Sequence, residues 1–268
     1  TPLDLVNSPF SIEFYVKLPA QVNSKQTVCQ ISGSNSVISA FVRNSTDVSR
    51  KRLEFHILSS SFHTFVSASI PTDKFTHVSL VYDGSDNEDR EKEFVDEDRQ
   101  KLLIYVDGDL AGKSKESITF NSLDFDSSDI LYIGTGSKMP TPNFDPAFMT
   151  DSFLPLQTFS GSIDEFRFFK KARKFKEINR TIRENIFPDI NTLLYFKFNE
   201  ISSNTGIEDV VIDSSGNGLH SKITNYNLSP MRVVQTGSNN NFKHMQYEQK
   251  ELNPVLFVRD EKNKQFLE

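Results

Sequence analysis

Apolar and polar residues alternate along much of the first 170 positions of the chain. In Pro9–Leu18 every second side chain is apolar, so these side chains share one face of a predicted strand. The same pattern recurs after short polar gaps. We expect strands at Ser11–Lys17, Thr27–Ile31, Val37–Val42, Arg52–Leu58, Phe62–Ile70, Phe75–Tyr82, Leu102–Val106, Leu110–Lys113, Ile130–Ile133 and Ile163–Phe169. This spacing is typical of an all-β fold, an antiparallel two-sheet sandwich, rather than of βαβ units.

The segment Phe159–Lys171 is expected to contain the closing strand of the sandwich, and it carries two adjacent acids. Strict alternation places Asp164 on the same face as Phe166 and Phe168. The opposite face then takes Ile163, Glu165, Arg167 and Phe169. The Asp164 carboxylate is therefore predicted to point inward, where it needs a cation, a basic side chain or loop N–H groups as a partner.

One short helix is expected after the closing strand. Apolar residues recur at spacings of three and four along Phe175–Ile186, and Pro188 ends the pattern. Arg173 and Lys174 stand where Ser or Thr would cap such a helix, so the predicted cap is weak.

Two long segments show no strand pattern. Ser85–Arg99 is densely charged with few apolar residues, and we interpret it as an exposed hairpin loop. A cation-binding acidic loop is the alternative interpretation. Ser137–Gln157 contains four prolines and is expected to form a second long loop.

Composition excludes some classes of function. The net charge of −6 and the absence of a basic stripe argue against nucleic acid as a partner. No apolar run approaches the length of a membrane span. Cys29 is the one cysteine, so there is no internal disulfide, and it is expected to be a core residue. The chain begins at Thr1 directly before strand-like sequence, and we expect it to be a piece of a longer polypeptide.

Four segments in a fixed order resemble the laminin-G-like, concanavalin-A-like jelly-roll (LamG-type) family. These are KFTHVSLVYDG, KLLIYVDGDLAG, ILYIGTG and FSGSIDEFRFFKKARKFKEI, and the resemblance covers roughly residues 3–185. It implies a jelly-roll sandwich in residues 1–188. One departure is Phe75, where the family commonly has Trp; the chain has 24 Phe and no Trp.

Thr192–Glu200 and Val210–His220 resemble the opening of another module of the same family, including its DSSGNG turn. Residues 189–268 are therefore expected either to start a second, similar module or to form a C-terminal extension that packs on the first. A tandem arrangement would be typical of an extended surface or scaffold protein.

The resemblance also implies a calcium site. In modules of this type a structural calcium often lies between the DSSGNG turn and the acid of the closing strand, here Asp213 and Asp164. The alternatives are an Asx turn at Asp213 and a hydrogen-bonding acid at Asp164. No cofactor other than calcium is predicted, and the residues of any ligand-binding site are not predicted.

No catalytic residues are predicted. Sandwich glucanases carry acids at alternate positions of one strand, and no such strand is present; Asp164 and Glu165 are adjacent and point to opposite faces under strict alternation. The five histidines show no metal-ligand spacing. His56 and His77 lie on predicted strands as core or surface residues.

These observations predict a non-catalytic interaction or structural module of a larger multi-module surface or viral-particle protein, without enzyme activity. Its partners would be neighbouring modules, other structural proteins or glycans, with no membrane insertion. It would be located outside the cell, at a cell surface or in a virion. The alternative is a calcium-dependent lectin that uses loop aromatics such as Phe144, Phe148 and Phe153. The third hypothesis is a glycoside hydrolase with a sandwich fold.

Overall fold

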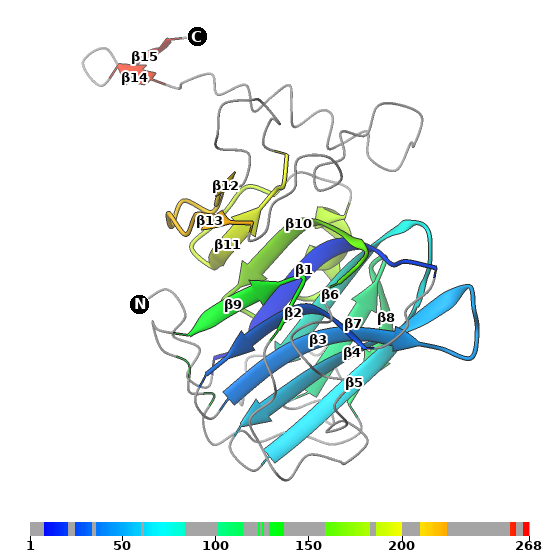
Figure 1. The fold of residues 1–268 in the computed structure, drawn as a ribbon. Coiled ribbons are helices and arrows are strands. Elements are labelled where there is room, and N and C mark those ends of the chain that lie inside the picture. Colours follow the sequence, from blue (N-terminus) through cyan, green and yellow to red (C-terminus); the bar gives the residue numbers. More distant parts are fainter. Residues whose placement is uncertain are drawn as a thin grey trace.

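A computed structural model describes residues 8–20, 25–33, 36–59, 62–83, 101–114, 123, 125, 129–136, 159–182, 186–199, 210–223, 258–260 and 265–267. Most of these residues form two antiparallel sheets packed face to face (Figure 1). The six-stranded sheet has the order β11 (Thr192–Phe196), β10 (Ser162–Phe169), β1 (Phe10–Lys17), β6 (Phe75–Asp83), β7 (Lys101–Val106), β8 (Asp109–Lys113). The five-stranded sheet has the order β5 (Phe62–Pro71), β4 (Arg50–Ser59), β3 (Ser36–Asn44), β2 (Gln26–Ser32), β9 (Ile130–Ile133).

The remaining described elements are short. The helix α1 (Phe175–Thr181) follows β10, and β12 (Val210–Val211) pairs with β13 (Ser221–Lys222). Near the C-terminus β14 (Val258–Asp260) pairs with β15 (Gln265–Leu267). The predicted all-β two-sheet sandwich with one helix after the closing strand is confirmed, and the predicted strands agree with the observed ones to within a few residues. In the described residues no helix is long and apolar enough to cross a membrane.

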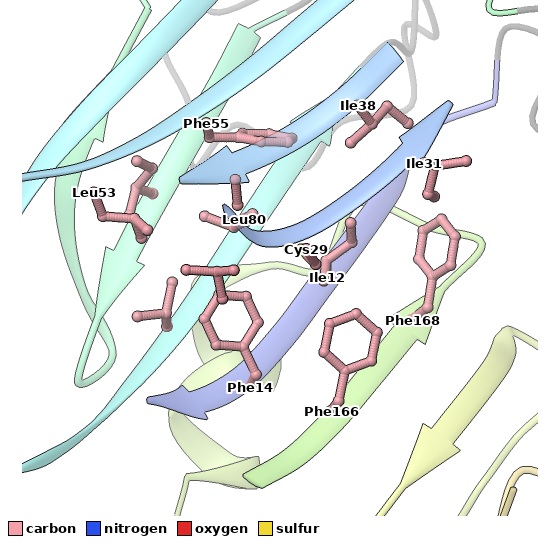
Figure 2. Close-up of a cluster of buried hydrophobic side chains, with 14 of the residues drawn as sticks. Ile12, Phe14, Cys29, Ile31, Ile38, Leu53, Phe55, Leu80, Phe166 and Phe168 are labelled. Atoms are coloured by element: carbon pink, nitrogen blue, oxygen red, sulfur yellow. The ribbon is translucent and has the colours of Figure 1, made fainter. Parts of the chain in front are cut away.

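The apolar positions of the alternating pattern meet between the two sheets. Figure 2 shows Ile12, Phe14, Leu80, Phe166 and Phe168 of the six-stranded sheet pointing toward Cys29, Ile31, Ile38, Leu53 and Phe55 of the five-stranded sheet. All ten side chains are buried. Removing this apolar surface from water is the main favourable contribution to folding. Burial also raises the pKa of the Cys29 thiol to about 12, so Cys29 is an unreactive core residue, as predicted.

The sandwich closes along one edge, where β5 lies against β8. Gly112 of β8 allows this approach, because a Cβ atom there would stand 2.6 Å from the backbone oxygen of Ser67 in β5. The opposite edge of the six-stranded sheet is extended by β11, which pairs with β10. The division of the chain at residue 188 stays a prediction.

The predicted orientation of Asp164 is wrong, because β10 contains a bulge. Glu165 has a positive φ of 53°, and the register with β1 shifts at this point, so that Asp164 pairs with Tyr15 while Arg167 pairs with Glu13. Ile163 consequently packs against the same core cluster as Phe166. Asp164 is half-buried and shares the outer face with Tyr15. One extra residue therefore reverses the alternation that the sequence pattern assumed.

The helix is shorter than predicted. It spans Phe175–Thr181 rather than Phe175–Ile186, and Ile182 is its C-cap. The Lys174 side chain accepts no capping bond. Instead Glu177 Oε2 accepts a hydrogen bond from the Lys174 backbone N–H at 2.9 Å. This is the carboxylate half of a capping box, and it stabilises the first turn without a Ser or Thr cap.

Candidate functional site

The outer face of the five-stranded sheet carries a row of polar and aromatic side chains. In β4, Leu53, Phe55 and Ile57 point into the core. Glu54 and His56 lie between these positions and therefore point outward. Their neighbours on the same face come from β3 and β5. We call the set Arg43, Arg52, Glu54, His56, His63, Phe41 and Phe65 the outer-face site.

The charged part of the site is built around one carboxylate. Arg43 Nε donates to Glu54 Oε1 at 2.6 Å, and Arg52 Nε lies 3.1 Å from the same oxygen. The Glu54 side chain is fully buried, whereas the side chains of Arg43 and Arg52 are 37% and 43% exposed. Both guanidinium groups thus converge on one buried carboxylate and extend toward solvent.

The aromatic part of the site is a stack of rings. The His56 ring lies between Phe41, at a centroid distance of 4.4 Å, and Phe65, at 4.9 Å, and is nearly parallel to both. Phe41 is buried, and Phe65 is 37% exposed. His56 Nε2 lies 3.2 Å from Glu54 Oε2, and His56 Nδ1 lies 2.9 Å from His63 Nε2. These contacts fix the orientation of the imidazole and, through it, of the Phe65 ring.

Electrostatics keep Glu54 ionised and His56 neutral. Burial raises the pKa of Glu54, but the hydrogen bond from His56 and the charges of Arg43 and Arg52 together hold it below its ordinary value. Burial is also the main cause that lowers the pKa of His56, and it outweighs the attraction of Glu54. At neutral pH His56 can then donate from Nε2 to Glu54 and accept from His63 at Nδ1.

This arrangement suits binding better than acid–base chemistry. The described side chains that contact Glu54 are Arg43, Arg52 and His56, so no second carboxylate is paired with it as glycoside hydrolysis requires. Ser39 lies opposite His56 in the β3–β4 register, but its buried hydroxyl makes no hydrogen bond within the described residues. Because both ring nitrogens of His56 are already engaged, no activated serine results.

Sequence reasoning missed this site. It treated His56 as an isolated core or surface histidine, and it did not consider Glu54 with Arg43. The available signal was the spacing of Arg52, Glu54 and His56, which places three polar residues on one face of a strand. The contacts with β3 depend on strand register, which pairs Arg43 with Arg52 and Phe41 with Glu54.

A second polar cluster lies on the outer face of the six-stranded sheet, beneath α1. Glu13 Oε2 accepts from Arg173 Nη1 at 2.7 Å, with Arg167 Nη1 at 3.9 Å. Arg167 Nη2 pairs with Glu165 at 2.5 Å, and the Tyr195 hydroxyl also donates to Glu165. All five side chains are buried. The alternation in Pro9–Leu18 places Glu13 on the face opposite the apolar side chains, where exposure to solvent would be expected, but α1 covers that face.

This second cluster holds α1 onto the sheet. Arg173 Nη2 donates to the Glu177 backbone oxygen at 2.9 Å and to Thr181 Oγ1 at 3.0 Å, both in α1. The Tyr15 hydroxyl donates to the Ile182 backbone oxygen at 3.0 Å. Since every charged member is buried and paired, we assign the cluster a structural role. His77, 3.6 Å from Glu13, belongs to it.

Asp213 organises the turn at 213–219. Its Oδ1 accepts from the backbone N–H groups of Tyr195 and Ser215, and its Oδ2 accepts from the Ser215 hydroxyl and the Leu219 N–H, at 2.8–3.0 Å. Burial raises the pKa of Asp213, but these donors together hold it below its ordinary value. The turn is thereby tied to β11.

Asp164 uses its Oδ1 to accept from the Glu165 N–H at 2.9 Å. Among the residues that the structure describes, no three His, Cys, Asp or Glu side chains are grouped so that they could hold a metal ion. The four donors at Asp213 already occupy the positions that a cation would take. The calcium site at Asp164 and Asp213 stays a prediction.

Replacing Asp213 with alanine is expected to lower the free energy of unfolding by about 2–3 kcal/mol, because three backbone N–H groups lose their acceptor. Asp213→Asn, which retains one acceptor oxygen, should lose less. Chelator should leave the melting temperature of the wild-type chain unchanged if these hydrogen bonds are the whole role of Asp213. A melting temperature that chelator lowers in the wild type but not in Asp213→Ala would instead establish calcium at this turn.

Several predicted features lie outside the described residues. They are the acidic segment Ser85–Arg99, all of Ser137–Gln157 with its loop aromatics Phe144, Phe148 and Phe153, and His244.

Comparisons with solved structures identify similar folds at low sequence identity. A candidate carbohydrate-binding protein from Bacteroides ovatus is 18% identical with a TM-score of 0.51, and the match covers 83% of this chain and 56% of that one. Domain 4 of the extracellular arabinanase AbnA from Geobacillus stearothermophilus, solved with arabinotriose, is 17% identical with a TM-score of 0.42, and the match covers 67% and 68% of the two chains. The Ruminococcus gnavus sialidase module CBM40, bound to sialyllactose, is 10% identical with a TM-score of 0.42, covering 65% and 82%.

No curated protein sequence matches this chain significantly. A family match is found over residues 1–179, more than half of the 268-residue chain. The match covers every strand of the two sheets except β11. It also covers most of α1. The expected resemblance is thereby confirmed, and the chain belongs to the concanavalin A-like lectin/glucanases superfamily.

Proposed function

We propose that this chain is a non-catalytic, glycan-binding module of a larger extracellular protein, and that it binds sugar at the outer-face site. The observation that carries the proposal is the Phe65 ring. One face of the ring stacks on His56, and the Phe65 residue is 37% exposed. The guanidinium groups of Arg43 and Arg52 lie on the same face of the sheet.

This combination matches what a sugar presents to a protein. The C–H groups on one side of a pyranose ring pack against an aromatic face, and its hydroxyl groups need donors and acceptors. A ring held in place by His56 loses little conformational freedom when it binds a ligand. The superfamily includes both lectins and glucanases, and the proposal favours the former because Glu54 has two arginines beside it rather than a second acid. The fold shared with a candidate carbohydrate-binding protein is consistent with this.

Phe65→Ala is expected to weaken glycan binding by about tenfold or more, since burial of a phenylalanine side chain contributes about 1.5–3 kcal/mol. The measurement is a glycan array with the 268-residue chain, followed by calorimetry on the best ligand. Phe175→Ala is the matched control, because Phe175 is 45% exposed but lies on α1, over the other sheet.

Two results would contradict the proposal. The first is an array on which no glycan binds the wild-type chain. The second is an equal loss of affinity in Phe65→Ala and Phe175→Ala. Incubation with β-glucans provides an additional test, because release of reducing ends would show hydrolysis instead of binding alone.

A further inference from the structure

We infer that the outer-face site selects acidic glycans, those carrying a carboxylate or a sulfate, through the paired guanidinium groups of Arg43 and Arg52. This inference rests on the proposed glycan-binding function and names the class of ligand. It starts from a feature of the β3–β4 register, in which Arg43 and Arg52 are direct cross-strand partners.

Two like charges directly opposite each other destabilise a sheet, so such a pair needs compensation. Glu54 provides only part of it. The two Nε atoms contact the same oxygen, Glu54 Oε1, at 2.6 and 3.1 Å. Two positive charges therefore share one negative charge. His56, whose pKa is lowered by burial, is neutral and does not change this balance.

The donors that remain on these arginines suit an anion. Within the described residues Arg43 and Arg52 use only Nε toward protein, so their terminal Nη groups make no hydrogen bond there. The side chains of Arg43 and Arg52 are each about two-fifths exposed. A planar guanidinium matches the oxygens of a carboxylate or sulfate in a bidentate geometry, and such charge-assisted bonds are stronger than bonds to neutral hydroxyl groups.

Other charges near the pair add to the positive potential. Lys25 lies with its Nζ 5.9 Å from the centre of the Phe41 ring. Arg50 shares the face of Arg52 and is held by Ser69 at 2.8 Å. Among the described residues, the nearby acid besides Glu54 is Asp47 in the β3–β4 turn, whose carboxylate accepts hydrogen bonds from Ser49. Within the described residues, cations are therefore in local excess, although the whole chain has a net charge of −6.

Phe65 favours an anionic group that is carried by a sugar over a flexible polyanion that has no sugar ring. The exposed ring gives the C–H face of a pyranose a surface to pack on, while the sugar's acidic group reaches the guanidinium pair. A ligand without such a face would use the charges alone, and its binding would be weaker and strongly reduced by salt.

The test compares matched ligands on the full 268-residue chain by calorimetry. One pair is a sialylated trisaccharide and its neutral lactose core. The other is a heparin-derived hexasaccharide and its desulfated counterpart. Inorganic polyphosphate serves as a polyanion that contains neither a sugar ring nor an aromatic base. We expect the acidic member of at least one pair to bind about tenfold or more tightly than its neutral partner. A preference for the sialylated or for the sulfated ligand identifies carboxylate or sulfate as the group recognised.

Variants of Arg43 and Arg52 distinguish the contribution of positive charge to binding from that of guanidinium geometry. Arg43→Gln and Arg52→Gln should each reduce the preference for the acidic ligand about tenfold. Arg52→Lys keeps the positive charge but loses the planar guanidinium that can donate two parallel hydrogen bonds, and it should give an intermediate affinity. Arg180→Gln, on the exposed side of α1, is the matched control and should leave binding unchanged. Melting curves of all variants establish that each is folded.

The outcomes distinguish this inference from the proposed function. Equal binding of acidic and neutral glycans, unchanged in Arg43→Gln and Arg52→Gln, overturns the inference and leaves glycan binding intact. Polyphosphate binding as tight as that of the acidic glycans also overturns it, since general electrostatic attraction would then suffice. Absence of binding to any glycan overturns the proposed function together with the inference.

Discussion

Replacing Glu13 with glutamine is expected to lower the free energy of unfolding by about 3–5 kcal/mol, because it breaks a buried ion pair. Glu13 is fully buried and compensates the charges of Arg173 at 2.7 Å and Arg167 at 3.9 Å. Glutamine has nearly the same volume, so the loss would come from two buried guanidinium groups left with too little negative charge. Urea unfolding monitored by circular dichroism would measure it.

Lys74→Gln is the control for this experiment, because Lys74 forms an ion pair with Asp107 at 3.6 Å in which both side chains are about half exposed. Such pairs contribute only about 0–1 kcal/mol. A loss below about 1 kcal/mol in Glu13→Gln would show that Glu13 does not hold the cluster beneath α1.

The same variant has a predicted pH dependence. Burial raises the pKa of Glu13, but His77, Arg173 and Arg167 outweigh burial and hold it below its ordinary value. A carboxyl whose pKa is lower in the folded state stabilises the protein above its unfolded pKa of about 4.3 and loses this contribution as the pH falls through the folded value. The difference in stability between wild type and Glu13→Gln should therefore be constant near neutrality and shrink below about pH 4.

Phe166→Ala is expected to cost about 3–5 kcal/mol, because it leaves a cavity between two sheets that cannot move together to fill it. Phe166 is fully buried in β10 and stacks on Phe14 of β1, with ring centres 6.0 Å apart and planes within 7° (Figure 2). The expected result is a lower denaturant midpoint with an unchanged slope of the unfolding transition.

Phe187→Ala is the control for Phe166→Ala. Phe187 is 86% exposed, so its replacement should change stability by less than about 0.5 kcal/mol. Similar losses in both variants would mean that the Phe166 position is not part of the packed core and that the strand orientation after the bulge at Glu165 is incorrect.

The strands and the sandwich could be predicted from the sequence because alternation is a local property. Each side chain in a strand points to the face opposite its neighbours, so the pattern in β1 or β6 identifies both the strand and its core face without knowledge of the partners. The helix could also be located, since the spacing of Phe175 and Ile178 is read along one segment. Its end could not, because the last turn depends on contacts that only the folded chain provides.

Two features of the strands needed more than the pattern. Alternation assumes a regular ladder, and the bulge at Glu165 adds one residue against β1, which moves Asp164 to the outer face. Alternation also cannot say whether a polar face meets solvent. Glu13 has a polar neighbourhood in the sequence, yet it is buried, because α1 returns to lie over β1.

The sequence by itself determined the class of fold, the core faces of the regular strands and the resemblance to the family to which the chain belongs. The tertiary structure alone decided the outer-face site. Arg43 and Glu54 come from different strands, and only the register of β3 and β4 places Arg43 opposite Arg52 with one carboxylate between them. The physical reason is that the hydrophobic pattern depends on neighbours within one strand, whereas the chemistry of a sheet face depends on which residues of adjacent strands are paired.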